Sequence, residues 1–320
     1  MRRHLVARLW QSLIVIILVT TISFVVIRLA PGDPFSYDAG TITPAVREYW
    51  REQFGYNRPI PEQFSRYVAS VLHGQLGYSF QMHEPVSRAL ADTVPRTLLL
   101  GALALGVSFL FGIVVGVLQA VRRGAWFDRI SSMTLLILYS LPDFWGALII
   151  LLIFAYWWPV LPAGNIVDPV LHDYMTPWAA IVDRLRHLVL PVLTLALLTT
   201  AGFARFQRAA MLDVLPADYI RTARAKGLTE RQVIWKHALR TALTPMVTLL
   251  GLALPGLLGG ALFIENVFGW PGMGSLAASA IRARDYDLVS AVVVVGSVIV
   301  VVGNLVADLL HMAIDPRVRA

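Results

Sequence analysis

The sequence predicts an all-α integral membrane protein of six transmembrane helices, with both termini in the cytoplasm. Of its 320 residues, 57% are hydrophobic and only 15% are charged, whereas a soluble domain carries about 25% charged residues. Long stretches almost without charge recur at lengths that cross a bilayer. Basic residues gather in alternate segments between those stretches, and this asymmetry indicates an orientation.

The predicted spans follow from length, because a helix needs about 20 apolar residues to cross a hydrocarbon core roughly 30 Å thick. Six segments meet this requirement: Leu9–Ile27, Thr97–Val121, Ile130–Trp157, Leu188–Phe206, Ala242–Ile264 and Leu288–Leu310. The fourth is the most irregular, because Pro191 and Arg205 interrupt it. Membrane helices tolerate proline where neighbouring groups satisfy the freed carbonyl, so the segment is kept as a span.

The first segment is interpreted as a retained anchor rather than a signal peptide. Its apolar stretch is longer than a typical signal h-region, and it continues into Leu29-Ala30-Pro31 without an A-x-A cleavage site. Arg2 and Arg3 lack the surroundings of a twin-arginine signal and are interpreted as topology charges.

The distribution of charge favours a cytoplasmic N-terminus. The inside segments are then residues 1–8, 122–129, 205–241 and 311–320, and the outside segments are residues 28–96, 158–187 and 265–287. The inside segments hold 16 of the 27 Lys and Arg residues, although the outside segments are about twice as long in total. Acidic residues lean the other way, with 5 inside and 13 outside.

The longest outside segment, residues 28–96, is too polar to insert and too long for a simple turn. Patterned stretches at Ala45–Phe54 and Glu62–Leu72 predict a small, mostly helical extracytoplasmic subdomain. It has two candidate roles, covering the pore mouth or receiving an external partner. A passive insertion is the alternative that composition alone favours slightly.

Several kinds of chemistry are excluded by what the sequence lacks. Without cysteine there is no disulfide, thiolate zinc site or iron–sulfur cluster. A phosphate-binding P-loop requires G-x-x-x-x-G-K-[ST], and neither Lys226 nor Lys236, the only lysines, stands in that context. The H-E-x-x-H and G-x-S-x-G motifs are absent, and no two histidines are four residues apart. We therefore expect no catalytic site, metal or cofactor in this chain.

Charged residues within spans are functional candidates by default. Asp143 and Asp308 are the two we single out, and Asp308 lies near the cytoplasmic end of the last span, where water reaches it. Asp143 follows Pro142 and is placed near a broken helix, where it is a candidate for the substrate path. Structural hydrogen bonding is the favoured alternative for Asp143.

The inside segment between the fourth and fifth spans is predicted to fold as two helices. Asp218 is a candidate N-cap for a short helix that ends just before Gly227. Gly227 suits the left-handed position after that helix, and Leu228 supplies the apolar contact that follows it. Thr229 begins a second helix with Gln232 three residues on, as in a capping box, and this helix continues into the fifth span.

This segment is predicted to dock a partner protein. Ala223, Ala225 and Gly227 are small and let another surface approach the backbone, while the surrounding Arg and Lys pair with acidic groups. The same spacing matches a DNA-binding helix-turn-helix, but membrane spans hold both ends of the segment and would keep a recognition helix at the lipid surface. A solvated basic loop is the remaining alternative.

Four segments together resemble the inner-membrane permease subunit of bacterial ATP-binding-cassette importers, in the B-type permease of the dipeptide/oligopeptide/nickel branch. They are RLAPGDP at residues 28–34, YIRTARAKGL at residues 219–228 with HALR at residues 237–240, ENVFGWPGMG at residues 265–274, and DPR at residues 315–317. The resemblance covers the whole chain. One departure stands in the loop, where Arg221-Thr222-Ala223 replaces the Glu-Ala-Ala of the general family and changes the charge of the contact.

The resemblance implies a single permease domain over residues 1–320, with an extracytoplasmic subdomain at residues 28–96 and a cytoplasmic coupling loop at residues 208–241. The implied ATPase-coupling residues are Tyr219, Arg221, Thr222, Ala223, Arg224, Ala225, Lys226, Gly227 and Leu228. The implied extracytoplasmic loop residues are Glu265, Phe268, Pro271, Gly272 and Gly274.

The implied partners are a homologous second permease, two ATPase subunits or domains that bind ATP and Mg²⁺, an extracytoplasmic substrate-binding protein and membrane lipid, with no nucleic acid. The chain is then expected in the bacterial inner membrane, importing peptides by alternating access; nickel chelates and glutathione are related substrates of similar permeases. The alternatives are a self-contained secondary carrier or channel and a membrane-anchored signalling protein.

Overall fold

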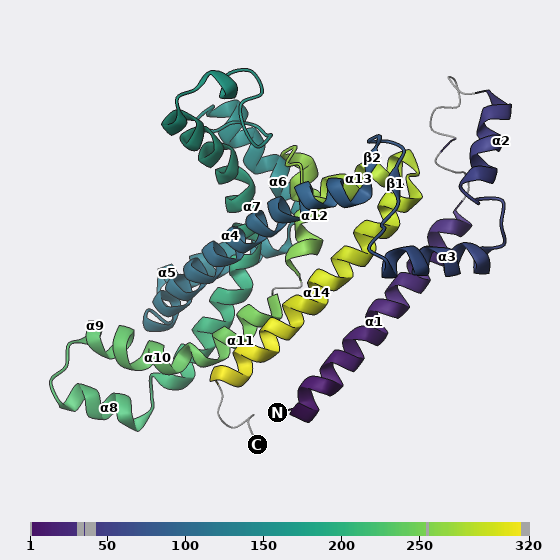
Figure 1. Cartoon of the computed structure of the whole chain (residues 1–320). Coiled ribbons are helices and arrows are strands. Elements are labelled where there is room, and N and C mark those ends of the chain that lie inside the picture. Colours follow the sequence, from purple (N-terminus) through teal and green to yellow (C-terminus); the bar gives the residue numbers. More distant parts are fainter. Residues whose placement is uncertain (1, 31–34, 36–42, 254–255, 315–320) are drawn as a thin grey trace. The chain divides into compact units, whose positions relative to one another are not determined.

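The computed structural model describes residues 2–30, 35, 43–253 and 256–314 (Figure 1). These residues are mainly helical, and they include a two-stranded antiparallel ribbon in which Tyr78 pairs with Pro85. The chain divides into two compact units. Unit 1 comprises Met1–Thr97 and Pro271–Val301, and unit 2 comprises Leu98–Trp270 and Val302–Ala320.

Four helices in the described residues are long and apolar enough to cross a membrane. They are Arg8–Leu29 within α1 (Arg2–Leu29), α4 (Val86–Val121), α7 (Pro177–Val214) and Tyr286–Leu309 within α14 (Tyr286–Ile314). They correspond to the first, second, fourth and sixth predicted spans. Pro191 lies inside α7, which continues through it as expected.

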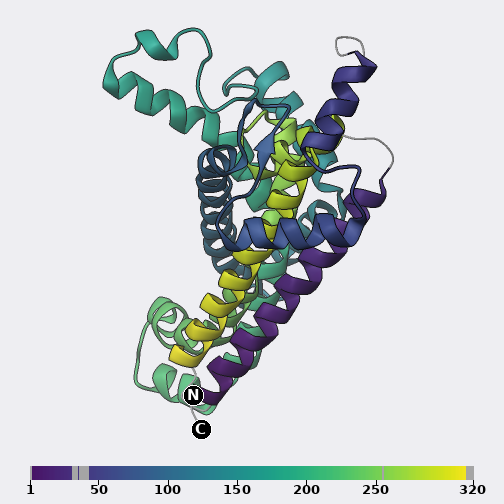
Figure 2. The same cartoon turned by 45° about the vertical axis from the view of Figure 1, so that its right-hand side comes forward.

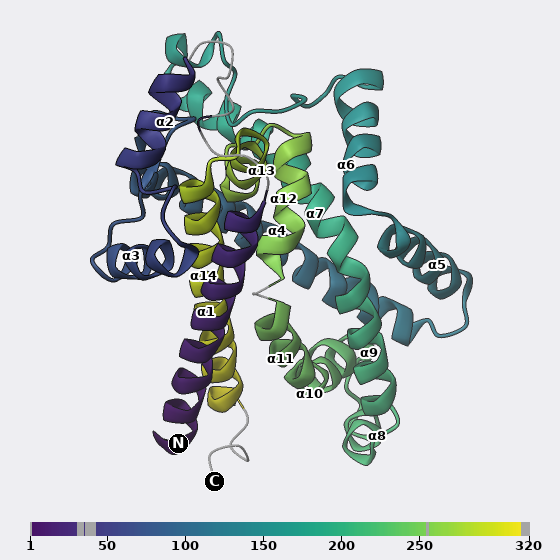
Figure 3. The same cartoon turned by 90° about the vertical axis from the view of Figure 1, so that its right-hand side faces the viewer.

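The third predicted span is broken in the middle. The two halves are α5 (Trp126–Ser140) and α6 (Asp143–Leu151), and a π-helix over Leu152–Trp157 prolongs α6. The halves meet at an angle of 110° (Figure 3). Leu141 is extended, with φ −77° and ψ 136°, because the ring of the proline that follows disfavours helical geometry there. The pair counts as a fifth span only if both halves belong to one crossing. The expected position of Asp143 beside a broken helix is confirmed.

The fifth predicted span, Ala242–Ile264, is also divided. It comprises the end of α10 (Leu239–Ala242), α11 (Thr244–Ala253) and most of α12 (Leu257–Val267), and residues 254–255 lie outside the described part. None of these helices alone is long enough to cross a membrane. The described residues therefore support four spans, or five with the bent pair, and the six-span count stays a prediction.

Unit 2 is built around α7. A buried cluster joins α4, α6, α7 and α12 through Leu100, Ala104, Ala147, Leu190, Val192, Leu195, Ile264, Phe268 and Trp270. Helix α4 approaches α7 so closely that a Cβ on Gly116 would lie 2.5 Å from the Ala204 carbonyl oxygen and 2.7 Å from Gln207 Cβ. Small residues permit such contact between membrane helices, where dispersion replaces the hydrophobic effect as the main attraction.

Unit 1 contains the polar segment before α4. The predicted helical stretches Ala45–Phe54 and Glu62–Leu72 are confirmed as α2 (Pro44–Gln53) and α3 (Ile60–Leu72). Strands β1 (Tyr78–Ser79) and β2 (Glu84–Pro85) follow, and α3 crosses α1 near its end (Figure 2). The unit also holds α13 (Met273–Ala283). Residues 31–34 of the RLAPGDP motif lie outside the described part of the chain. The DPR motif at residues 315–317 also lies outside it.

Arg28, at the end of α1, holds an aromatic cluster in unit 1. Its guanidinium carbon lies 4.3 Å from the Tyr56 ring centroid and 5.7 Å from that of Tyr286. Its Nη2 lies 3.6 Å from Asp287 Oδ1. Burial in this cluster raises the pKa of the Tyr56 hydroxyl, so Tyr56 stays neutral across the physiological range. One planar cation therefore connects α1, the loop before α3 and α14.

Replacing Arg28 with lysine is expected to weaken this cluster, because an ammonium does not stack on rings as a guanidinium does. The loss is about 0.5–2 kcal/mol of stability. Thermal unfolding of the purified chain in detergent, with proteinase K cleavage between α1 and α4, measures it. Arg66→Lys, at a side chain that is 58% exposed, is the control. Equal unfolding midpoints and cleavage rates in both variants would contradict this role of Arg28.

Gly116→Ala is expected to destabilise unit 2 by about 1–3 kcal/mol, because the added methyl group meets the α7 backbone and forces the helices apart. Gly106→Ala, on the same helix, meets no atom within 4 Å and is the matched control. Unfolding midpoints of the two variants check the prediction. A Gly116→Ala protein as stable as Gly106→Ala would show that α4 and α7 are not in tight contact.

Candidate functional site

The segment after α7 folds as the sequence predicts, with one correction. Helix α8 (Asp218–Ala225) ends in a Schellman motif: Gly227 N–H donates to the Arg224 carbonyl at 2.9 Å, and Leu228 N–H donates to the Ala223 carbonyl at 3.4 Å. Gly227 has φ +77°, the left-handed conformation that glycine adopts without strain. The N-cap prediction was wrong, because Ala217 occupies that position and Asp218 is the first helical residue.

A second short helix, α9 (Glu230–Gln232), starts with the predicted capping box. The Thr229 hydroxyl accepts from Gln232 N–H at 3.4 Å, and the Gln232 side chain accepts from Thr229 N–H at 3.2 Å. The chain then continues as a π-helix over Val233–Ala238, which leads into α10 (Figure 1). Residues 217–233 are called the α8–α9 loop below.

The inner face of the α8–α9 loop is apolar. Ile220 and Val233 are fully buried, and they share a cluster with the ends of α4 and α7 and with α10. The buried members are Val117, Ala120, Met211, Ile220, Ala223, Val233, Ala238 and Ala242. Ala223 is only 6% exposed, so its small size serves packing inside the chain and not an outer contact. Leu228 also packs against this cluster.

The outer face of the α8–α9 loop is polar and mainly basic. The exposed residues of the predicted coupling set are Tyr219, Arg221, Thr222, Arg224, Ala225, Lys226 and Gly227. The Arg221 side chain is 71% exposed and lies 3.7 Å from Asp218, a contact worth little in water. Arg224 Nε donates to Glu230 Oε1 at 2.7 Å and so connects α8 to α9.

The structure assigns the predicted extracytoplasmic loop residues to both units. In unit 2, Glu265 and Phe268 are buried at the end of α12, and Trp270 N–H donates to the Glu265 carbonyl at 2.8 Å. In unit 1, Gly272 caps α13, and Thr97 Oγ1 accepts from Met273 N–H at 2.7 Å. Pro271 and Gly274, also in unit 1, are half-buried. This degree of burial indicates that the set contributes to folding.

Asp143 stands in the first turn of α6, directly after the bend. It is half-buried, and its placement on a substrate path stays a prediction. The described residues contain no group of His, Cys, Asp and Glu that could hold a metal ion.

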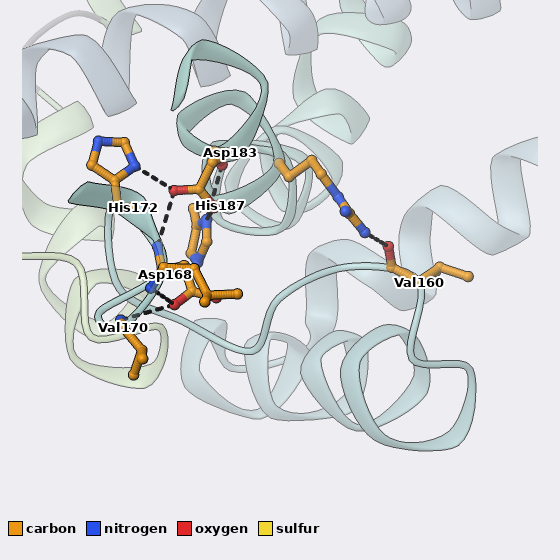
Figure 4. A network of polar contacts seen from close by, with 8 residues as sticks. Val160, Asp168, Val170, His172, Asp183 and His187 are labelled. Carbon is orange, nitrogen blue, oxygen red and sulfur yellow. Dashed lines mark hydrogen bonds and ion pairs between the residues drawn. The ribbon is translucent and has the colours of Figure 1, made fainter. Parts of the chain in front are cut away.

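Sequence reasoning missed a polar network at the start of α7 (Figure 4). Asp183 Oδ2 accepts from Asp168 N–H at 3.0 Å and lies 2.7 Å from His172 Nδ1, while Asp183 Oδ1 lies 3.1 Å from His187 Nδ1. Backbone N–H groups of residues 171 and 170 lower the pKa of Asp168. The network fixes the preceding loop on α7, and the Asp183–His187 spacing of four residues was its one sequence signal.

Comparison of the sequence with known proteins places the chain in a family. Residues 112–320 match the family model described as "Binding-protein-dependent transport system inner membrane component", and residues 1–101 match "Binding-prot-dependent transport system membrane comp, N-term". The first match alone covers more than half of the chain.

Similar proteins align over almost their whole length. The oligopeptide transport system permease protein AppB of Bacillus subtilis is 36% identical over 321 residues, covering 100% of both chains. The dipeptide transport system permease protein DppB of Escherichia coli K12 is 36% identical, covering 94% of both. The probable D,D-dipeptide transport system permease protein DdpB of the same strain is 39% identical, covering 97% of this chain and 96% of the relative.

These alignments and the apolar helices establish a multi-pass protein of the bacterial inner membrane. The chain belongs to the family of inner membrane components of binding-protein-dependent transport systems.

Proposed function

We propose that this chain is the permease subunit of an ATP-driven importer of peptides, and that an ATPase subunit docks on the outer face of its α8–α9 loop. Family membership and the peptide permeases among its relatives support the transport class and the substrate class. Neither lysine can serve a P-loop, so the nucleotide and its Mg²⁺ belong on a partner chain. The docking proposal rests on the two faces of the α8–α9 loop: the inner face is apolar and the outer face is mainly basic.

The loop is suited to transmit force because it shares a core with two spans, α4 and α7, and with α10. Burying Ile220 and Val233 contributes on the order of 1.5–3 kcal/mol each, which is lost if the loop moves without the helices beneath it. Met211 of α7 and Val117 of α4 belong to the same core. A displacement of the loop therefore moves the ends of α4, α7 and α10 together.

The outer face specifies the chemistry of the docking partner. Arg221 and Lys226 extend from α8, while Arg224 is held by Glu230. An acidic groove on the ATPase would complement them, and an arginine hydrogen bonded to a carboxylate contributes about 1.5–3 kcal/mol. Arg221 stands where the general family has glutamate, so the matching ATPase groove is more acidic here.

The remaining assignments complete this proposal. The chain spans the membrane six times with both termini inside, pairs with a homologous permease, and receives substrate from an extracytoplasmic binding protein near residues 28–96. It forms half of the path, and it catalyses no reaction itself. The self-contained carrier or channel considered from sequence is not favoured by the family assignment.

Arg221→Glu is expected to abolish ATP-dependent uptake of labelled di- and oligopeptides while leaving membrane insertion intact, because the reversed charge repels an acidic groove. Uptake is measured in cells that lack other peptide importers and co-express the partner genes. Co-purification of the ATPase should fall in parallel. Arg66→Glu in α3 is the exposed control. Normal uptake together with normal ATPase recovery in Arg221→Glu would contradict docking on this face.

Gly227→Pro is expected to abolish uptake, whereas Gly227→Asn retains most of it. Proline fixes φ near −65° and removes the N–H that bonds the Arg224 carbonyl, while asparagine tolerates φ +77° and keeps that bond. Both variants should insert normally, as membrane fractionation will show. If the two variants transport equally well, the turn geometry has no part in docking.

A further inference from the structure

Unit 2 contains a cavity of about 800 Å³ between α4, α5 and α7. This volume is within the range of about 300–1,000 Å³ typical of small-molecule sites. Its lining residues are Gln119, Ser132, Leu135, Leu136, Tyr139, Ala201, Gly202, Arg205, Phe206, Arg208 and Ala209. Neither the predicted coupling set nor Asp143 is among them, so the cavity is a separate feature of the permease.

Helix α7 supplies one wall of this cavity from residues spaced by three or four positions. Ala201, Gly202 and Ala209 leave the backbone accessible, and Arg205 and Arg208 stand between them on the same face. A Cβ on Gly202 would meet no atom within 4 Å, so there is open room beside the helix. The α7 wall therefore consists of small residues apart from Phe206 and the two cations.

The two arginines differ in their partners. Arg208 donates to Asp128 Oδ1 through Nε and to Asp128 Oδ2 through Nη2, both at 2.9 Å. Asp128 is 4% exposed and also accepts from Gly124 N–H at 2.9 Å, so this pair is fixed and neutral. The Arg205 side chain is exposed, and within the described residues it forms no hydrogen bond or ion pair. The cavity wall thus carries one uncompensated positive charge.

We propose that this cavity binds the transported peptide, with Arg205 holding its terminal carboxylate. The assignment rests on the proposed function, because it takes the substrate to be a peptide. A carboxylate accepts two parallel N–H bonds from a guanidinium, and every linear peptide with a free C-terminus carries this group whatever its side chains. Recognition through Arg205 would therefore be independent of peptide sequence.

The rest of the lining fits a peptide better than a lipid. On the two helices facing α7, Gln119 already donates to Ser131 at 2.9 Å and Ser132 to Asp128 at 3.5 Å, so their amide and hydroxyl oxygens are left as acceptors for peptide N–H groups. The Tyr139 hydroxyl can donate or accept. Leu135 and Phe206 provide apolar surface for side chains of varied shape. An anionic phospholipid shares the negative charge, but its acyl chains gain nothing from the amide and hydroxyl groups.

The test uses the absence of cysteine from the chain. Ala209→Cys places one thiol in the cavity wall of the full-length chain, reconstituted in phosphatidylcholine vesicles. The rate of modification by a membrane-permeant maleimide is measured against the concentration of trialanine or trialanine amide. Trialanine should protect the thiol at a concentration about tenfold lower than its amide, since the charged hydrogen bonds are lost with the carboxylate.

Arg205→Gln in the same background should remove the difference between acid and amide, while Arg205→Lys should keep part of it. Gly202→Cys is a second reporter should Ala209→Cys disturb the fold. Equal protection by acid and amide in the parent, or no protection by either, would overturn the proposal. Protection of the thiol that requires phosphatidylglycerol and Arg205 but no peptide would also overturn the proposal, because it would identify a lipid site.

Uptake by the assembled importer separates this inference from the proposed function. If the parent complex takes up no peptide with ATP, the proposed function fails. If uptake is normal but Arg205→Gln does not change the protection of the thiol by trialanine or by trialanine amide, only the assignment of the cavity fails. Arg221→Glu, outside the cavity, should lose uptake and keep acid-selective protection.

Discussion

Unit 2 depends on the close packing of other helices against α7. The backbone of α4 touches α7 at Gly116, α5 is held to it by the Asp128–Arg208 pair, and the α8–α9 loop packs under its end through Met211. Each contact uses a different interaction: dispersion at small residues, a charged bidentate hydrogen bond, and apolar burial. Because all three meet one continuous helix, a displacement at one place is not absorbed locally.

This arrangement gives the chain a rigid loop. The Schellman motif, the capping box and the Arg224–Glu230 contact each satisfy groups that would otherwise bond to water. The loop therefore presents a fixed surface, and its inner face belongs to the core of the spans. In the proposed mechanism, ATPase closure moves this surface, and α7 carries the movement toward the wall that holds Arg205.

Local signals in the sequence predicted several helices of the fold and the turn and cap of the α8–α9 loop. The glycine turn, the capping box and helices α2 and α3 follow from short-range chemistry that does not depend on the rest of the fold. The bend after Ser140 has a local cause in Pro142, but its 110° angle depends on packing against α7. The division of the fifth predicted span was missed because apolar composition does not distinguish one long helix from several short ones.

The errors within the site have different causes. Ala223 was assigned to the outer face because sequence spacing does not define which side of a short helix is covered. Asp218 was assigned to the N-cap from its side-chain type, but the helix begins at that residue. Arg205 was taken as an irregularity in a span, whereas the structure places it on a cavity wall. The network around Asp183 joins residues 11 and 15 positions apart, too distant in sequence for a local pattern to show.

The proposed mechanism depends on the docking of an ATPase on the outer face of the α8–α9 loop. Replacing Tyr219, which is 45% exposed, with the photo-cross-linking residue p-benzoylphenylalanine tests it in cells that express the intact transport system. We expect an adduct with a nucleotide-binding subunit, identified by mass spectrometry. We expect no such adduct when p-benzoylphenylalanine replaces Trp126, which is 78% exposed. The absence of an adduct at Tyr219, or an adduct with a protein that lacks a nucleotide site, would contradict it.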